Sequence, residues 1–408
     1  MSSVVEWVPF CARRLQTLPR LRSLVLPDRG QSRSRGKREV CELKSGTRKS
    51  PLRRWGYVSL RVPCLCFSFS FAFLGAERMA AQTPDPERPV PILSGSAGYF
   101  TNVTGGQAQL NPKTSPVLLL PIGDRWLIES RGEFEGDFRR TGGTGAYAGP
   151  VNKHLDYFEL DYIANRYLTV TTGRFLTPFG IFNERLYPIW IRSLQPDPLI
   201  FPIATGSSDG AMLRGGFPLD AKANMNYAAY VSVTSIGLGG VESTRLAGGR
   251  MGLFLPGPRI EAGASWQKSL QDERSNAFGF HFAWQPVRLP LNLRSEYARS
   301  FQGSGYWIEG AYRLTQVRFW QKAMRHMEIA ARAQQFFIGQ ISYNDAQQYG
   351  LPGVSTRESD LGLNYYLHDG LKVAASYGRQ FSSDGNLNLW TVGLAYRFAF
   401  PLGRLGAQ

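Results

Sequence analysis

The chain has 408 residues and a formal net charge of +16, and the position of that charge decides what it implies. Residues 1–81 hold 16 Lys and Arg against 5 Asp and Glu, a net +11, whereas the remainder holds 31 against 26, a net +5. Because a protein that binds nucleic acid by charge carries its basic residues on the folded body, this distribution excludes nucleic acid as an expected partner.

The first 81 residues resemble a targeting segment rather than part of a fold. Two arginines near the start of 51–81 precede a short apolar stretch, and small residues follow as far as Ala81. This order predicts a signal peptide at 51–81, cut near Ala81; the alternative is a buried helix of a soluble domain. Residues 1–50 are either a basic disordered leader or a mis-assigned start. A cysteine-free body suits a chain that is exported through an oxidising compartment, and every cysteine lies in this front part: Cys11, Cys41, Cys64 and Cys66.

Beyond Ala81, apolar and polar residues alternate in segments separated by turns. The clearest alternation places one apolar set on a single face: Trp390, Val392, Leu394, Tyr396, Phe398 and Phe400. Long strands that are apolar outside and polar inside are typical of outer-membrane barrels. The sequence therefore predicts an all-β fold, an antiparallel transmembrane β-barrel of about 16 strands (14–18) over residues 82–400, followed by a short tail at 401–408. A soluble all-β protein is the alternative.

The expected strands and connections follow a regular order. We expect strands to start near residues 94, 114, 125, 155, 167, 210, 223, 246, 259, 275, 290, 304, 326, 357, 370 and 387. Alternate connections between the expected strands are short turns, and among these only the connection at 315–325 is longer. The other connections are mostly longer and polar, at 103–113, 139–154, 177–209, 235–245, 268–274 and 338–356. Short turns at one end and longer loops at the other are the pattern of a bacterial barrel.

Charged residues fall on the face that the alternation turns inward. Because a charge on the lipid side of a barrel costs about 2–4 kcal/mol at mid-membrane, we expect them to line an aqueous lumen. Ion pairs that stiffen a plugged lumen are the alternative. The expected wall residues are Glu129, Arg131, Glu133, Glu135, Asp137, Arg214, Arg250, Arg294, Glu296, Arg313, Arg332 and Lys372.

The longest connection, 177–209, carries many large apolar residues and prolines. A solvated loop would not carry so many apolar groups, so we expect it to fold into the barrel and form a constriction. The expected constriction residues are Arg174, Arg185 and Arg192, with Glu184 opposing them.

One stretch resembles a known family. Gly173, Arg174 and Phe175, then Pro178, Phe179 and Gly180, and the opening of the next strand at Asp209 and Gly210 resemble the phosphate-selective porin O/P family of bacterial outer membranes. The resemblance implies a sixteen-stranded pore, possible passage of anions such as phosphate, and a possible homotrimer. The inner wall lacks the basic ladder expected of a phosphate-selective pore.

These observations predict an outer-membrane porin, exported through the periplasm, that passes small hydrophilic solutes or ions by diffusion. The expected partners are outer-membrane lipid, the solutes themselves and the outer-membrane assembly machinery. No enzyme activity, cofactor or metal is expected, because the four histidines show no ligand spacing and no phosphate-binding glycine loop appears. The alternative function is a closed outer-membrane barrel with a structural or surface-binding role.

Overall fold

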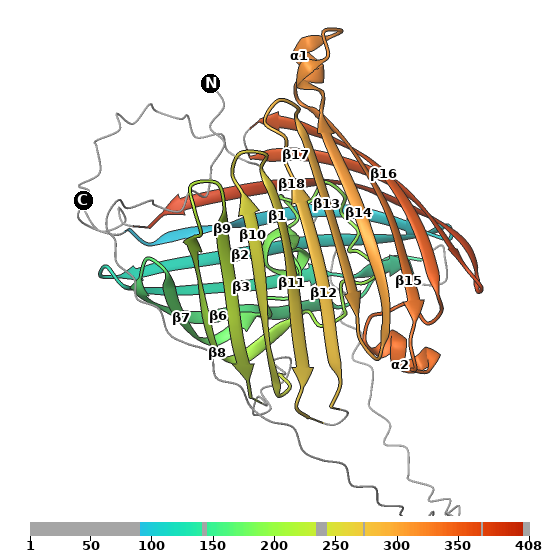
Figure 1. The fold of residues 1–408 in the computed structure, drawn as a ribbon. Helices are drawn as coiled ribbons and strands as arrows, with labels where there is room; N and C mark the ends of the chain where they lie inside the picture. The colour runs from blue at the N-terminus through green and yellow to red at the C-terminus, as the bar shows by residue number, and fades with distance from the viewer. Residues whose placement is uncertain (1–89, 141–144, 234–242, 272–273, 369, 403–408) are drawn as a thin grey trace, which may run out of the picture. The chain divides into compact units, whose positions relative to one another are not determined.

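A computed structural model describes residues 90–140, 145–233, 243–271, 274–368 and 370–402. The expected leader 1–50, the expected signal peptide 51–81 and most of the tail 401–408 lie outside the described residues. The described part of the chain is one β-sheet with a few short helical turns (Figure 1). Among these residues, no helix combines the length and the hydrophobicity needed to cross a membrane.

The strands follow one another around the sheet in chain order, and all pairings are antiparallel. The first half comprises β1 (Ile92–Thr104), β2 (Gln107–Ile122), β3 (Trp126–Gly136), β4 (Phe138–Arg140), β5 (Tyr147–Ala148), β6 (Val151–Asn165), β7 (Leu168–Leu176), β8 (Ser207–Pro218) and β9 (Asn224–Ser232). The second half comprises β10 (Leu246–Leu255), β11 (Ile260–Ser269), β12 (Asn276–Trp284), β13 (Leu291–Arg299), β14 (Gly303–Arg313), β15 (Met327–Ile338), β16 (Thr356–His368), β17 (Leu371–Ser382) and β18 (Gly385–Pro401). The helical turns are η2 (Phe182–Leu186), η3 (Leu314–Gln316), α1 (Gln321–Met324) and α2 (Tyr343–Gln348).

The sheet closes into a barrel of sixteen strands. β18 pairs with β17 on one side and with β1 on the other, so neither the first nor the last strand has a free edge. β4 continues β3 after a break at Asp137, and β5 leads into β6 after a break at Gly149, so each pair counts as one strand. The two breaks lie close together: a Cβ on Gly149 would lie 1.7 Å from the carbonyl oxygen of Asp137. The predicted strand number and fold class are confirmed.

The expected loop at 103–113 is wrong. Those residues belong mostly to β1 and β2, which are joined by Gly105 and Gly106 at φ angles of +57° and +83°. A two-residue hairpin turn with positive φ at both positions suits paired glycines. The polar residues misled the prediction because they face inward from a strand; Asn111, for example, is buried and donates to the carbonyl oxygen of Gly136.

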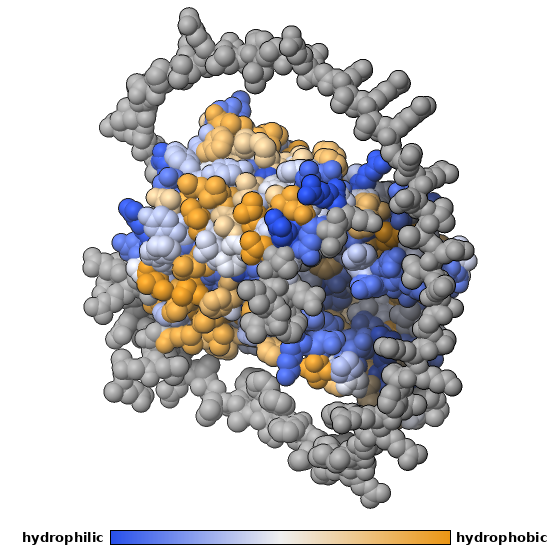
Figure 2. Space-filling model, turned by 90° about the horizontal axis from the view of Figure 1, so that it is seen from below, coloured by the Kyte–Doolittle hydropathy of each residue, from blue (hydrophilic) through white to orange (hydrophobic). Residues whose placement is uncertain are grey.

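The outer face of the barrel is apolar along most strands. In β12, Phe278 and Phe280 are exposed while the alternating Ala277 and His281 are buried, and β18 exposes Trp390 and its apolar neighbours in the same way. On the face seen in Figure 2, hydrophobic residues form broad patches beside hydrophilic ones. Extended apolar surface of this kind marks contact with a membrane or a partner.

Candidate functional site

The inner face of the barrel carries charged residues on most strands. Cross-strand partners share a face, so the register places Arg294 beside Glu309 and Arg332 beside Asp360 on the inside. The twelve expected wall residues all fall on this face: Glu129, Arg131, Glu133, Glu135 and, at the rim, Asp137 on or beside β3, Arg214 on β8, Arg250 on β10, Arg294 and Glu296 on β13, Arg313 on β14, Arg332 on β15, and Lys372 on β17.

Many of these charges are paired with one another. Nε of Arg131 lies 3.0 Å from Asp156 Oδ2, Nη2 of Arg294 lies 2.9 Å from Glu309 Oε1, and Nε of Arg332 lies 3.1 Å from Asp360 Oδ2. Ionised groups taken out of water need such partners, because leaving one unpaired costs several kcal/mol. The wall of the lumen is therefore a set of ion pairs rather than a ladder of one sign. Among the described residues, no group of three or more His, Cys, Asp or Glu side chains fits a metal ion.

The connection between β7 and β8, residues 177–206, is tied together at its two ends. The backbone N–H of Thr177 donates to the carbonyl oxygen of Gly206 at 2.9 Å. The amide Nδ2 of Asn183 donates to the carbonyl oxygens of both Thr177 and Gly206 at 3.0 Å. This neck makes the segment a compact loop whose ends meet. We call residues 177–206 the inserted segment.

The inserted segment packs its large apolar residues against the inner wall. Phe179, Phe182 and Ile203 are buried in one cluster with Trp307 of β14 and Phe336 of β15. Beside these large side chains the wall carries glycine at positions where a larger side chain would collide with the segment. A Cβ on Gly279 would lie 2.8 Å from the ring of Phe179, and one on Gly362 would lie 2.5 Å from Cδ2 of Leu194.

Wall carboxylates and amides hold the backbone of the inserted segment. Oε2 of Glu296, on β13, accepts the N–H groups of Ile181 and Phe182 at 3.1 and 3.2 Å. The amide of Gln334, on β15, accepts the N–H of Leu199 at 2.8 Å. These acceptors bind backbone N–H groups that would otherwise be buried without a partner. A buried N–H group without a partner costs about 1–3 kcal/mol.

Wall cations hold the carbonyl groups of the same segment. Lys372, which is fully buried on β17, donates through Nζ to the carbonyl oxygens of Ile189, Trp190 and Arg192 at 3.2, 2.9 and 2.7 Å. Nη1 of Arg332 donates to the carbonyl oxygen of Pro196 at 2.9 Å. The charge of Lys372 is therefore compensated by oriented peptide dipoles and not by a carboxylate in direct contact.

The inserted segment also reaches the opposite wall. The hydroxyl of Tyr187 donates to Glu133 Oε1, on β3, at 2.9 Å, and the guanidinium of Arg131 lies 4.9 Å from the centre of the Tyr187 ring. Burial raises the pKa of the Tyr187 phenol, so the hydroxyl keeps the proton that it donates. In Figure 1 the segment is seen between the front strands β10–β13 and the back strands β1–β3, in agreement with contacts to both sides.

The structure brings three of the four expected constriction residues into the inserted segment but not into one cluster. Glu184 pairs with Arg250 of β10, and Nη1 of Arg185 lies 2.7 Å from Glu261 Oε2 of β11. Arg192 turns back into its own segment, where its Nε donates to the carbonyl oxygen of Tyr187 at 2.7 Å. Glu184 therefore faces a wall arginine and not the arginines of the segment.

The expected position of Arg174 is wrong. Its register partners are Phe158 on β6 and Asp209 on β8, and Phe158 is exposed on the outer face. Because cross-strand partners share a face, Arg174 also lies on the outside, where its Nη1 is 3.0 Å from Asp209 Oδ1. The neighbouring Phe175 is the residue that points inward and is buried. Strand alternation, applied to this position, would have excluded Arg174.

A part of the wall remains outside this network of contacts. Described hydrogen bonds of the inserted segment beyond its neck run to β3, β10, β11, β13, β15, β16 and β17. None of them runs to β6, β7, β8 or β9, and we call these four strands the free wall; the contact between the hydroxyls of Thr177 and Ser208 belongs to the neck. Beside this free wall lies a cavity of about 130 Å³ lined by Glu129, Glu159, Glu184 and Arg214 among others, with room for several water molecules. Arg214 pairs with Asp161 and lies 3.5 Å from Glu159 Oε1.

The sequence prediction missed several residues that hold the inserted segment: Asn183, Tyr187, Ser265, Gln334 and Asn364. The wall members of this set, Ser265, Gln334 and Asn364, share one signal that the sequence offered. They are polar residues on the inward positions of alternating strands, where only charged residues were counted. Asn183 and Tyr187 lie within the segment, and no sequence pattern marks their partners.

The chain was compared with known proteins. No family model and no curated protein sequence matches it, so the resemblance to the phosphate-selective porin O/P family remains a prediction. Among solved structures it is similar to Pseudomonas putida OprB at low pH, with a TM-score of 0.50 and 10% identity over 76% of this chain and 92% of that chain. It is also similar to Salmonella typhi OmpF in complex with daunomycin, with a TM-score of 0.50 and 14% identity over 76% of this chain and 97% of that chain. At these identities the likeness shows the fold, a closed sixteen-stranded antiparallel β-barrel.

Proposed function

We propose that the protein is a channel of a bacterial outer membrane through which small hydrophilic solutes or ions pass by diffusion. The observation that carries the proposal is the inside-out distribution of residues on a closed barrel, apolar outside and charged inside. A barrel that folded around a dry core would place its apolar face inward. The solved structures that share the fold are outer-membrane porins, which supports the same function.

We further propose that the inserted segment narrows the lumen. Its contacts with β3 on one side and with β10–β17 on the other support this role, because they hold large side chains across the interior. The passage that remains lies beside β6, β7 and β8, where Glu129, Glu159 and Arg214 line the cavity. Solutes would meet charges of both signs there, which orients polar molecules in a narrow pore.

The proposal includes export and assembly. A signal peptide at 51–81 would send the chain through the periplasm, and the outer-membrane assembly machinery would insert it among lipids. A homotrimer is proposed from the family resemblance alone. Sequencing the N-terminus of the exported protein tests the first step: a mature chain that begins near Gln82 is expected, and one that begins before Arg53 would contradict the signal peptide.

A preference for anions such as phosphate, which the resemblance implies, finds little support at the free wall. Three carboxylates, Glu129, Glu159 and Asp161, surround the single Arg214 there. Phosphate passing along this wall would meet more negative than positive charge. We therefore propose passage of small solutes without a phosphate preference, and the sign of the reversal potential in a salt gradient tests this point.

Single-channel recording in a planar bilayer tests the channel itself. The refolded chain is expected to give discrete conductance steps of stable size. Folding is checked separately by the change in electrophoretic mobility on heating, which barrels show when they unfold. Folded protein that gives no conductance would contradict the proposal.

The second candidate is a closed barrel with a structural or surface-binding role. It is favoured by one observation, the density of hydrogen bonds between the inserted segment and the wall, which leaves little free lumen beside β10–β17. In that case the connections at the loop end of the barrel would do the binding. The same recording separates the two candidates, because a closed barrel gives no conductance steps.

A further inference from the structure

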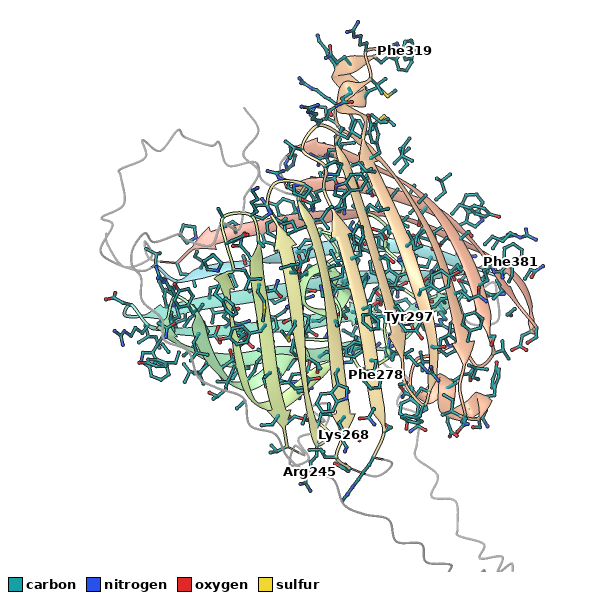
Figure 3. The ribbon with its side chains drawn as sticks, in the orientation of Figure 1. Arg245, Lys268, Phe278, Tyr297, Phe319 and Phe381 are labelled. Carbon is teal, nitrogen blue, oxygen red and sulfur yellow. The ribbon has the colours of Figure 1, made fainter. Side chains whose placement is uncertain are left out.

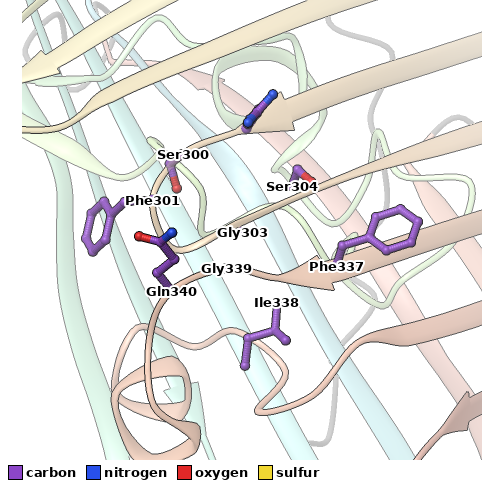
Figure 4. A pocket seen from close by; sticks show the side chains of 9 residues that line it. Ser300, Phe301, Gly303, Ser304, Phe337, Ile338, Gly339 and Gln340 are labelled. Atoms are coloured by element: carbon purple, nitrogen blue, oxygen red, sulfur yellow. The ribbon is translucent and has the colours of Figure 1, made fainter.

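A pocket outside the lumen lies at the loop end of the barrel. It has a volume of about 360 Å³ and is formed where the turn between β13 and β14 meets the end of β15. Figure 4 shows Ser300, Phe301 and Gln340 around it, with Phe337 on the far side from Phe301. Neither the inserted segment nor the charges of the lumen form part of it.

The rim of this pocket is fixed by backbone hydrogen bonds. The N–H of Gly339 donates to the carbonyl oxygen of Gln302 at 2.9 Å, and the N–H of Gln340 donates to that of Phe301 at 3.1 Å. A Cβ on Gly339 would lie 2.2 Å from the carbonyl oxygen of Phe301, so the approach of the two turns requires a glycine. The pocket is therefore a built feature of the rim.

Arg299 supplies the charge of the pocket. It is exposed at the end of β13, and its cross-strand partners are Phe278 of β12 and Ser304 of β14, so it lies on the outer face together with the exposed Phe278. Within the described residues, Arg299 has no ion pair or hydrogen bond through its guanidinium, whose donors are free for a ligand. The hydroxyls of Ser300 and Ser304 line the same pocket.

The residues around Arg299 favour a ligand that has both an anionic group and an apolar part. The outer face of strands β12–β17 presents no carboxylate in its alternating positions. Aromatic residues flank Arg299 instead, with Tyr306 and Phe337 exposed on the next strands. Figure 3 shows Phe278 and Tyr297 on the front of the barrel, with Lys268 and Arg245 at its lower end. A guanidinium beside hydroxyls suits a phosphate, and the aromatic side chains suit acyl chains.

We propose that the pocket around Arg299 binds the phosphate-bearing headgroup of an anionic lipid, whose acyl chains lie on Tyr306 and Phe337. The proposal rests on the proposed function, because a lipid reaches this face only when the barrel lies in a membrane. Free inorganic phosphate shares the headgroup chemistry, and the test separates the two sources. Arg299 donates its guanidinium hydrogens to the phosphate oxygens, and Ser304 adds a hydroxyl donor.

The test is a calorimetric titration of the refolded chain in an uncharged detergent with short-chain phosphatidylglycerol. Arg299→Gln is expected to weaken binding by about ten-fold or more, as loss of a charge-assisted hydrogen bond to phosphate does. The matched control is Arg357→Gln, on the outer face of β16 and outside the pocket, which should leave the affinity unchanged. Short-chain phosphatidylcholine should bind more weakly than phosphatidylglycerol to the unchanged protein.

Two results would overturn the proposal. Equal loss of binding in Arg299→Gln and Arg357→Gln would mean that general surface charge, and not the pocket, attracts the lipid. Displacement of the lipid by inorganic phosphate at equal concentration would assign the pocket to the free ion. Conductance is recorded from the same preparations, so a chain that binds lipid through Arg299 but conducts no current would contradict the proposed function and leave the lipid site standing. Arg299→Lys, which keeps the charge, checks that any loss is not misfolding.

Discussion

Two parts of the inner wall differ in what covers them. Strands β10–β17 hold the inserted segment through Glu296, Lys372 and Arg332, whereas β6–β9 make no described hydrogen bond to it beyond its neck. We call these the covered wall and the free wall. Both carry charges that form ion pairs, but only on the covered wall do described charged side chains also bind backbone groups of the segment. A charged side chain that points into a barrel can therefore hold a loop in place by hydrogen bonds to its backbone, and need not line a pore.

The two walls also differ in how they are packed. The covered wall offers small residues such as Gly279 and Gly362 where the segment approaches, and buries Trp307 and Phe336 against its aromatic side chains. The free wall leaves a cavity among charged groups beside Arg214. We infer that the two walls divide the tasks of holding the segment and lining the passage, and the predictions below test that division.

The largest effect is expected from removing most of the inserted segment. Replacing residues 180–203 by a short glycine linker keeps the backbone hydrogen bond between Thr177 and Gly206, although it removes the two bonds that Asn183 adds at the neck. Because the segment occupies the space against the covered wall, its removal should raise single-channel conductance more than any single substitution does. The mobility shift on heating checks that the barrel still forms. An unchanged conductance in a folded barrel would mean that the segment does not narrow the path.

The next effect is expected from Lys372→Met. The substitution removes three hydrogen bonds. It leaves the carbonyl oxygens of Trp190 and Arg192 without the donor that Lys372 supplies, while the carbonyl oxygen of Ile189 keeps the amide of Gln195 at 3.3 Å. Loss of charged hydrogen bonds of this kind should lower the free energy of unfolding by about 3 kcal/mol. Urea unfolding of the protein in lipid vesicles measures it. Lys222→Met, in the exposed turn between β8 and β9, is the control and should change stability by less than about 0.5 kcal/mol.

A smaller loss is expected from Glu296→Gln. The glutamine keeps one oxygen that can accept from Ile181 or Phe182, so the segment loses charge assistance but not every acceptor. We expect a decrease of about 1–2 kcal/mol in the free energy of unfolding, measured in the same way. Glu135→Gln, near the rim, is the matched control. A loss as large as that of Lys372→Met would show that the negative charge itself is needed to hold the segment.

The fold could be predicted from the sequence because one physical rule acts at every strand. Alternation places each side chain on one of two faces, and the expected strand starts at residues such as 246 and 387 lie within two residues of the observed ones. The rule failed where polar residues looked like a loop, as at Asn111. There the polar side chain faces the inside of the barrel, where it bonds to Asn102 and to the carbonyl oxygen of Gly136.

The interior could be predicted only in part. The alternation along each strand identifies which residues point inward, because it depends on that strand alone. The contacts that these residues make depend on how the long connection between β7 and β8 folds back into the barrel. Nothing local connects Lys372 to Ile189 or Glu296 to Phe182, which lie more than a hundred residues apart in the chain. Arg174 shows the reverse error: the chemistry suggested a pore residue, and the alternation that places it outside was not applied.

The smallest effect, and the sharpest test of the division between walls, concerns charge selectivity. Glu159→Gln removes a negative charge from the free wall, so the reversal potential in a salt gradient should shift towards anion preference, and Arg214→Gln beside it should shift the potential the opposite way. Glu309→Gln removes the same charge from the covered wall, where Glu309 is buried against Arg294. Its shift should be smaller, because ions that pass along β6–β8 do not approach it. Equal shifts from Glu159→Gln and Glu309→Gln would mean that solutes sample both walls, and the passage would then have to lie nearer the barrel axis than the free wall.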